Sequence, residues 1–175
     1  MRVLITAGGT EEPIDGVRTI SNFSTGSTGA ILANSLKDKG LDVTLLTSLR
    51  GVTPKDCVLV ERFQSFIDLD NKLQHLLKKG NFNVVIHCAA VSDYSVDYLI
   101  SGDKKVTPDS RHKLDSSKAL QIVLKPNFKI IEKIKSYSSN NLTLIGFKLT
   151  KNSNDELIKK KVDSIFQSGT VDYVV

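Results

Sequence analysis

Long hydrophobic segments and tryptophan are missing from this 175-residue chain, and cysteine is rare. No apolar run approaches the roughly 18 residues of a membrane-spanning helix, so we expect no membrane association. Arg2 is not followed by an apolar region ending in a cleavage site of small residues, so we expect no signal peptide and a cytoplasmic location. Cys57 and Cys88 lack metal-ligand spacing, and we expect buried thiols rather than a disulfide.

Aromatic residues are also sparse, at 6% of the chain, and no basic run is interleaved with them. Aromatic stacking platforms among cationic side chains are typical of nucleic-acid-binding proteins, so a nucleic-acid partner is disfavoured. The net charge of +5 still favours an anionic ligand. A small phosphorylated molecule such as a nucleotide fits both observations.

Apolar segments of strand length alternate with helical patterns along the chain. Strands are expected at residues 2–7, 41–48, 57–63, 82–91, 142–150 and 171–175, and helices at residues 26–39, 65–79, 128–135 and 155–166. This alternation predicts a three-layer α/β fold with a mostly parallel central sheet and right-handed crossovers, formed by residues 1–175 as one domain. Residues 119–124 are interpreted as an edge strand, and residues 92–114, which lack periodicity, as a long functional or mobile loop.

Ligands of such sheets bind beyond the carboxyl ends of the strands. Four segments are expected to meet at that edge: Gly8-Gly9, Thr47-Ser48, residues 89–93 and residues 146–148. We therefore place the candidate site there.

Neither of two common phosphate-binding fingerprints is present. A polar loop separates Gly8-Gly9 from Gly26, so no GxGxxG turn forms, and no Gly-Lys-Ser/Thr follows to make a P-loop. The order strand, glycine turn, helix start nevertheless suits an anion, because the first amides of a helix are unpaired. Hydroxyls at Ser24 and Thr25 strengthen this interpretation. A plain tight turn and a small-residue packing contact stay open as the alternative.

The loop between the glycines carries Arg18 and Asn22. Arg18 is either a solvated charge or a guanidinium that grips a carboxylate or phosphate at two points. Asn22 either caps the following helix or donates to a carbonyl of a reacting intermediate. Spacing alone does not separate these alternatives.

Asp93 directly follows the most apolar strand, after Ala89 and Ala90. The two small residues would let a flat ring approach the backbone, and the acid could accept from sugar hydroxyls or hold a metal ion. A helix N-cap is the structural alternative for Asp93. His87, inside the strand, is interpreted as a core histidine whose ring has its hydrogen-bond partners within the protein.

Two groups of lysines could meet a polyanion. Lys113 ends the long basic loop, where it is either solvated or brought to a developing negative charge. Lys159, Lys160 and Lys161 spread around one expected helix, so only one or two of them can face a site.

Three clusters resemble a known family: ITAGGTEEPIDGVRTISNFSTG, HCAAVSDY, and HKLDSS followed by IVLKP and GFKL. They are similar, over essentially the whole chain, to phosphopantothenoylcysteine synthetase, the phosphopantothenate–cysteine ligase of coenzyme A biosynthesis. The resemblance implies a Rossmann-like, homodimeric enzyme that uses Mg²⁺ and CTP, or ATP as in animals. It would join 4′-phosphopantothenate to L-cysteine through an acyl-nucleotidylate, releasing pyrophosphate.

The resemblance also implies roles for single positions. Asn22 matches the asparagine that holds the acyl-nucleotidylate, Arg18 an arginine needed for turnover, and Lys113 the lysine of a flexible flap at about residues 96–116. The implied nucleotide-binding residues are Gly8, Gly9, Ser24, Thr25, Gly26, Ala89, Asp93, Phe147 and Lys161. The metal ligands are not implied.

The chain departs from the family pattern in several places. Ser27-Thr28 stands where a basic residue is common, and the flap reads Lys113-Leu114-Asp115-Ser116, closer to the animal type. We expect no flavin-dependent decarboxylase before the domain, so the resemblance implies the monofunctional bacterial type. Members usually continue past the strand matching VDYVV, so we expect the family's C-terminal segment to be missing.

Two other function classes stay open. A Rossmann-type NAD(P) oxidoreductase would need a GxGxxG turn, which is absent, and a Tyr-x-x-x-Lys pair, which Tyr94 and Tyr98 do not form. A non-catalytic nucleotide-binding module is the second alternative, and turnover would separate it from the ligase.

Overall fold

The computed structural model describes residues 1–55, 58–108, 111, 113–117, 119–148, 163, 166 and 169–175. Cys57, Lys161 and most of the helix expected at residues 155–166 lie outside the described residues, so their predictions stay predictions.

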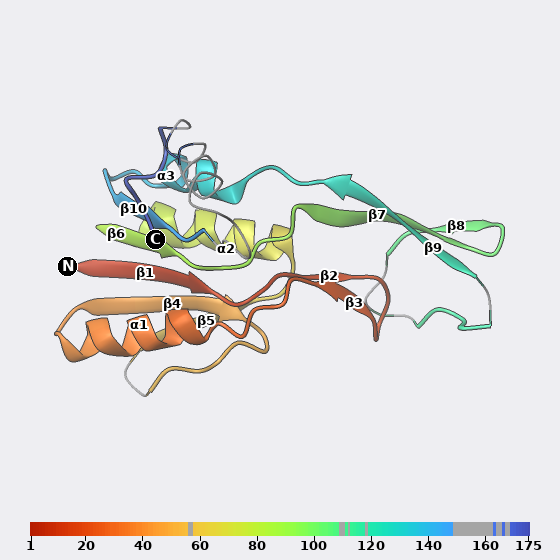
Figure 1. The fold of residues 1–175 in the computed structure, drawn as a ribbon, viewed down its shortest axis with the longest axis horizontal. Helices are drawn as coiled ribbons and strands as arrows, with labels where there is room; N and C mark the ends of the chain where they lie inside the picture. Colours follow the sequence, from red (N-terminus) through yellow and green to blue (C-terminus); the bar gives the residue numbers. More distant parts are fainter. Residues whose placement is uncertain are drawn as a thin grey trace.

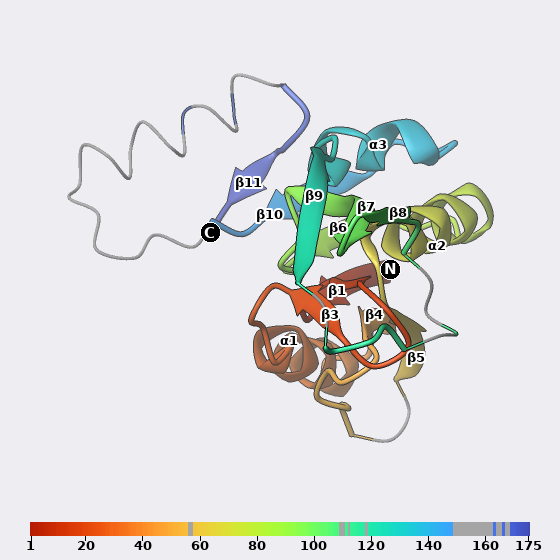
Figure 2. The ribbon, with the colours of Figure 1, turned by 90° about the vertical axis from the view of Figure 1, so that its right-hand side faces the viewer.

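The core of the molecule is a six-stranded sheet in which every neighbouring pair is parallel (Figure 1). In spatial order its strands are β11 (Tyr173–Val174), β10 (Thr143–Gly146), β6 (Val84–His87), β1 (Arg2–Ala7), β4 (Asp42–Ser48) and β5 (Leu59–Phe63). Helix α1 (Ser27–Asp38) covers one face, and α2 (Phe66–Lys79) with the short α3 (Ile134–Tyr137) covers the other (Figure 2). The predicted three-layer α/β fold is confirmed.

Strand β1 shows why a sheet covered on both faces is nearly all apolar. Leu4 packs into the cluster that contains Leu69 and Leu73 of α2, whereas Val3 and Ile5 pack on the opposite face with Ala33 of α1. All three β1 side chains are at most 1% exposed. Successive side chains of a strand point to opposite faces, so burial on both faces leaves no polar alternation.

A separate three-stranded antiparallel sheet projects from the carboxyl edge of the central sheet (Figure 1). It consists of β7 (Tyr94–Ser101), β8 (Lys104–Val106) and β9 (Leu120–Pro126), with β8 and β9 at its edges. The edge strand expected at 119–124 is confirmed, but the long loop expected at 92–114 is wrong at Tyr94–Ser101 and Lys104–Val106, which are strands. Only Leu99 of β7 is buried, so cross-strand pairing rather than an apolar face forms these strands.

A second antiparallel pair was not predicted. Strands β2 (Glu11–Pro13) and β3 (Thr19–Ser21) form a hairpin between β1 and α1, beside the projecting sheet (Figure 1). Each has three residues, too few to show a period. The helix expected at 128–135 is also different, because it divides into a 3-10 turn, η1 (Ile130–Glu132), and α3.

No helix in the described part of the chain is both long enough and apolar enough to cross a membrane.

Candidate active site

The glycine turn after β1 joins the carboxyl ends of the two central strands. Ala90 N–H donates to the Gly8 carbonyl at 2.9 Å, and Thr10 N–H donates to the Ala90 carbonyl at 3.2 Å. Gly8 has φ +81°, and a Cβ there would lie 2.2 Å from Ser48 Oγ at the end of β4. Three of the four predicted segments therefore meet directly at this edge.

The polar loop lies against the same edge through Asn22. A Cβ on Gly9 would lie 2.0 Å from the Asn22 carbonyl oxygen, so only glycine lets the two backbones approach. Asn22 Nδ2 donates to the Val91 carbonyl at 3.1 Å, and Asn22 N–H donates to the Thr10 carbonyl at 3.2 Å. The side chain does not cap α1, so the capping alternative for Asn22 is wrong.

The N-terminus of α1 carries no side-chain cap. Its N-cap is Gly26, with φ +74°, which has no side chain to cap the helix, and Thr25 Oγ1 accepts only a long bond from Ser27 N–H at 3.4 Å, whereas Ser65 caps α2 by accepting from Asp68 N–H. A small cavity of about 70 Å³ lies at this uncapped end and is lined by Ala7, Ser24, Thr25, Gly26, Ser27, Thr28, Gly29 and Cys88. Uncapped amides and hydroxyls around a small hollow suit a phosphate group.

A larger cavity of about 330 Å³ lies past the ends of β6 and β10. Its lining residues are His87, Ala89, Val91, Ser92, Asp93, Phe128, Lys129, Ile130, Ile131, Glu132, Phe147 and Lys148. The predicted nucleotide residues Ala89, Asp93 and Phe147 are thus brought together around one space. Aromatic and apolar walls with a few charged groups are typical of pockets for organic ligands.

Asp93 has a partner that the sequence did not suggest. Lys129 Nζ lies 2.5 Å from Asp93 Oδ1, and both side chains are more than half exposed. Because the strand β7, not a helix, follows Asp93, the N-cap alternative is wrong. The pair places one cation and one anion at the rim of the larger cavity.

His87 and Cys88, at the end of β6, are not poised for chemistry. His87 is 6% exposed, its Nδ1 lies 2.8 Å from Thr6 Oγ1, and burial lowers its pKa to about 4. The interpretation as a satisfied core histidine agrees with this geometry. Burial raises the pKa of the half-buried Cys88 thiol to about 12, so it is protonated at neutral pH.

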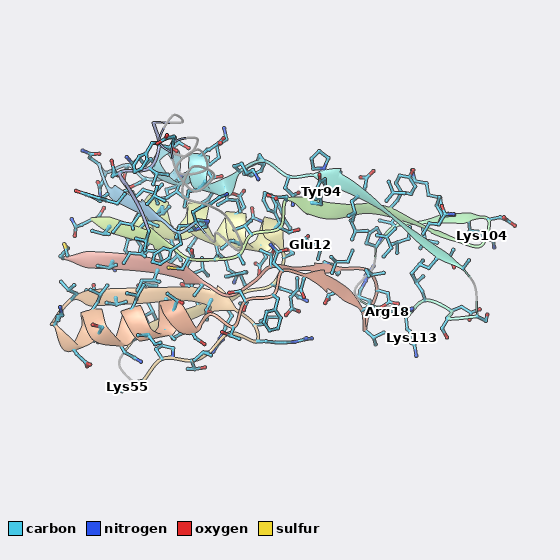
Figure 3. The ribbon with its side chains drawn as sticks, in the orientation of Figure 1. Glu12, Arg18, Lys55, Tyr94, Lys104 and Lys113 are labelled. Carbon is cyan, nitrogen blue, oxygen red and sulfur yellow. The ribbon has the colours of Figure 1, made fainter. Side chains whose placement is uncertain are left out.

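Arg18 and Lys113 come together away from the two cavities, beside the β2–β3 turn (Figure 3). Arg18 Nη2 lies 2.6 Å from Asp15 Oδ2 and donates to the Leu114 carbonyl at 3.0 Å. The Arg18 guanidinium holds the pKa of the Asp15 carboxyl well below its usual range. Arg18 is therefore not a solvated charge, and the residue after Lys113 is tied to it.

No group of three or more His, Cys, Asp or Glu side chains is placed to hold a metal ion within the described residues. Mg²⁺ often needs only one or two carboxylates, because substrate phosphates and waters supply its other ligands.

Several lining residues were missed in the sequence. Phe128 and Lys129 follow β9, and Lys148 follows β10, all at points where the chain enters or leaves an element. Lys148 does lie within a segment expected at the edge. For Phe128 and Lys129 the sequence carries no pattern that separates them from ordinary loop residues.

Comparison with known proteins shows the family of the chain and several of its relatives. The family model described as the DNA/pantothenate metabolism flavoprotein C-terminal domain matches residues 1–172. The coenzyme A biosynthesis bifunctional protein CoaBC of Thermococcus kodakarensis is 32% identical over 172 residues, covering 97% of this chain but 39% of that protein. The chain thus spans about two fifths of this curated relative.

Solved structures agree with the fold. The DNA/pantothenate metabolism flavoprotein from Streptococcus pneumoniae superposes with a TM-score of 0.84 at 28% identity, covering 99% of this chain and 80% of that one. The C-terminal domain of a CoaBC protein gives a TM-score of 0.70 at 28% identity, with coverages of 93% and 71%.

Proposed function

The chain belongs to the DNA/pantothenate metabolism flavoprotein C-terminal domain family, and from this membership we propose that it is a phosphopantothenate–cysteine ligase of coenzyme A biosynthesis. Its relative CoaBC is named as a coenzyme A biosynthesis protein, which supports the pathway. The proposed reaction activates the carboxylate of 4′-phosphopantothenate with CTP, in preference to ATP, and then forms the amide with L-cysteine. We further propose a cytoplasmic location.

One observation carries the proposal. The Asn22 amide is bonded to the Val91 carbonyl, and Val91 lines the larger cavity together with Ala89, Asp93 and Phe147. The Asn22 amide is therefore held beside a residue that lines the larger cavity, although Asn22 itself is not among the lining residues. That arrangement fits a residue that orients an acyl-nucleotidylate while the amine of cysteine attacks its carbonyl.

Charge neutralisation is the main demand of the first step. A carboxylate that attacks a triphosphate brings two anions together, so cations at the α-phosphate lower the barrier. We assign this role to Lys113 and Lys161, with Arg18 needed for turnover. Mg²⁺ bound with the triphosphate would supply further positive charge.

We assign different parts of the nucleotide to the two cavities. The small cavity at Gly26, with Ser24 and Thr25, suits a phosphate group, and the larger one suits the base and sugar. Gly8 and Gly9 shape the turn that lets these parts approach. A homodimer is also proposed, supported by the projecting sheet (Figure 1). Its apolar side chains Tyr94, Ile122 and Leu124 are exposed.

The test is pyrophosphate release. The protein is incubated with 4′-phosphopantothenate, L-cysteine, Mg²⁺ and either CTP or ATP, and pyrophosphate is measured with and without the pantothenate substrate. We expect release that requires 4′-phosphopantothenate and is faster with CTP.

A non-catalytic nucleotide-binding module predicts nucleotide binding without release. Folded protein that releases no pyrophosphate with either nucleotide would therefore overturn the ligase proposal. Faster release with ATP would overturn only the choice of nucleotide.

A further inference from the structure

The carboxylate of Asp15 joins two parts of the chain that are almost 100 residues apart. It lies in the turn between β2 and β3, and its side chain is 1% exposed. Its Oδ1 accepts from the backbone N–H groups of Val17 and Arg18, at 3.0 and 2.8 Å. These two bonds are local and shape the turn itself.

The second carboxylate oxygen of Asp15, Oδ2, connects Arg18 to Leu114. Asp15 Oδ2 accepts from Arg18 Nε at 2.9 Å and from Arg18 Nη2 at 2.6 Å, and it also accepts from Leu114 N–H at 3.0 Å. Arg18 Nη2 in turn donates to the Leu114 carbonyl at 3.0 Å. Both backbone polar groups of Leu114 are thus held by one partly buried ion pair.

Apolar burial contributes little to the position of this segment. Among the described residues from 111 to 117, only Leu114 is even half-buried, and the others, including Lys113, are exposed. An exposed segment cannot be fixed by apolar packing, so its position depends on polar contacts. Bonds to charged groups are the stronger kind, which suits them to this task.

One nitrogen of the Arg18 guanidinium takes no part in the ion pair and is available to bind a ligand. The bonds to Asp15 and Leu114 use Nε and Nη2, and Nη1 has no hydrogen-bond partner among the described residues. The Arg18 side chain is 38% exposed, although its partner is buried. The guanidinium is therefore fixed in direction and still accessible.

We propose that Asp15 is a positioning residue that holds Arg18 and the segment bearing Lys113 in one shared geometry. The catalytic assignment of those two cations rests on the proposed ligase function. The anchoring itself does not, and it can be measured without any substrate.

The test uses Asp15→Asn, which changes one oxygen into an amide nitrogen of nearly the same size. The introduced asparagine could still accept from Val17 and Arg18 N–H through Oδ1, but its NH₂ would face the donors of Arg18 and Leu114. Asp42→Asn is the matched control, since it alters the exposed Arg2–Asp42 pair elsewhere on the molecule. Arg18→Gln is the second variant, because it keeps the bond from Leu114 N–H to Asp15.

The first readout is native-state cleavage by trypsin after Lys113, followed by mass spectrometry. We expect Asp15→Asn to speed this cleavage about ten-fold, Arg18→Gln to speed it less, and Asp42→Asn to leave it unchanged. An unchanged rate in both Asp15→Asn and Arg18→Gln would overturn the proposal. If Asp15→Asn does not fold, the rate of Arg18→Gln decides alone.

The second readout is kinetic. We expect Asp15→Asn to lower kcat for pyrophosphate release about ten-fold while the KM for the nucleotide stays within about two-fold, because the nucleotide cavities do not contain Asp15. Faster cleavage with unchanged kcat would refute the positioning role. If the wild type releases no pyrophosphate, the ligase function fails, and cleavage alone decides whether Asp15 holds the segment.

Discussion

The Asn22 side chain connects the loop after β3 to Val91, a residue that lines the larger cavity. Its Nδ2 bond to the Val91 carbonyl and its backbone bond to Thr10 fix the amide in place. The close approach at Gly9 makes that position possible. An amide held this rigidly loses little entropy when it orients a bound intermediate.

Replacement of Asn22 by aspartate should separate the two half-reactions. A carboxylate at this position could not donate to the Val91 carbonyl, and it would place a negative charge beside a phosphorylated intermediate. We expect the Asn22→Asp variant to form the acyl-nucleotidylate but to release phosphopantothenoylcysteine at least about ten-fold more slowly. Rapid-quench analysis of both species would measure this.

A matched control exists on α1. Asn34 uses its Oδ1 to accept from Lys55 N–H, a contact that aspartate keeps. Asn34→Asp should therefore leave both half-reactions unchanged. Wild-type product release by Asn22→Asp would show that Asn22 does not hold the intermediate.

Glu12 is the point where β2, the start of α2 and the start of β7 meet (Figure 3). It is 5% exposed, its Oε1 accepts from Phe66 N–H at 2.7 Å, and its Oε2 lies 3.1 Å from Ser95 Oγ. Ser95 Oγ also lies 2.9 Å from Asn127 Oδ1. One hydroxyl proton cannot serve both acceptors, and burial raises the pKa of the Glu12 carboxyl.

Glutamine at this position should therefore stabilise the fold at neutral pH. The glutamine side chain could keep the bond from Phe66 N–H and donate to Ser95 Oγ, which would leave the Ser95 proton for Asn127. We expect Glu12→Gln to raise the free energy of unfolding by about 1 kcal/mol at pH 7, as measured by urea denaturation. The gain should shrink as the pH falls, because wild-type Glu12 then takes up a proton.

Glu11 provides the comparison on the same strand. Its carboxylate lies 3.7 Å from the exposed Arg50, so Glu11→Gln removes only a weak pair and should give no gain. Equal effects at both positions, or a loss of stability in Glu12→Gln, would show that the Glu12 charge is not costly.

Apart from the edge strand β9, which has no buried residue, the elements predicted correctly from the sequence are mainly those with a buried face. Burial leaves a pattern in the sequence of these elements. Strand β1 has consecutive apolar residues such as Leu4 and Ile5, and α2 has apolar residues at helical spacing and ends before Gly80. The β7–β8 strands show none, because their partners are other exposed strands.

The sequence predicted in part where the candidate site residues lie in the fold, and their roles stay predictions. Ala89, Asp93 and Phe147 follow buried strands, so topology alone brings them to one edge. Lys129 contacts Asp93, which lies 36 residues earlier, and Asp15 contacts Leu114, which lies 99 residues later. No local sequence pattern encodes contacts between such distant residues. Lys161 lies outside the described residues, and its role stays a prediction.

At the scale of the whole molecule, the polar side chains buried in the central sheet decide how stability responds to pH. Thr6 and His87 pair across the neighbouring strands β1 and β6, with Oγ1 and Nδ1 2.8 Å apart. The strands around them are largely apolar, and His87 is only 6% exposed at the wall of the larger cavity, so a charged imidazole would have little compensating hydration. Protonation of this one ring should therefore oppose the fold as a whole.

Stability should fall as the pH falls from 6.5 to about 4. The pKa of His87 lies near 4 in the fold and 6.5 in the unfolded chain, so within this window only the unfolded chain takes up the proton. We expect the contribution of His87 to cost about 2 kcal/mol between pH 7 and pH 5. In His87→Asn the new side chain offers Thr6 an oxygen and does not titrate, so the free energy of unfolding should change less between pH 7 and pH 5. Replacement of the exposed His75 on α2 by asparagine should leave this pH dependence unchanged. Urea denaturation of the three proteins at both pH values measures the difference, and an equal slope in wild type and His87→Asn would show that the ring is hydrated or paired in its charged form.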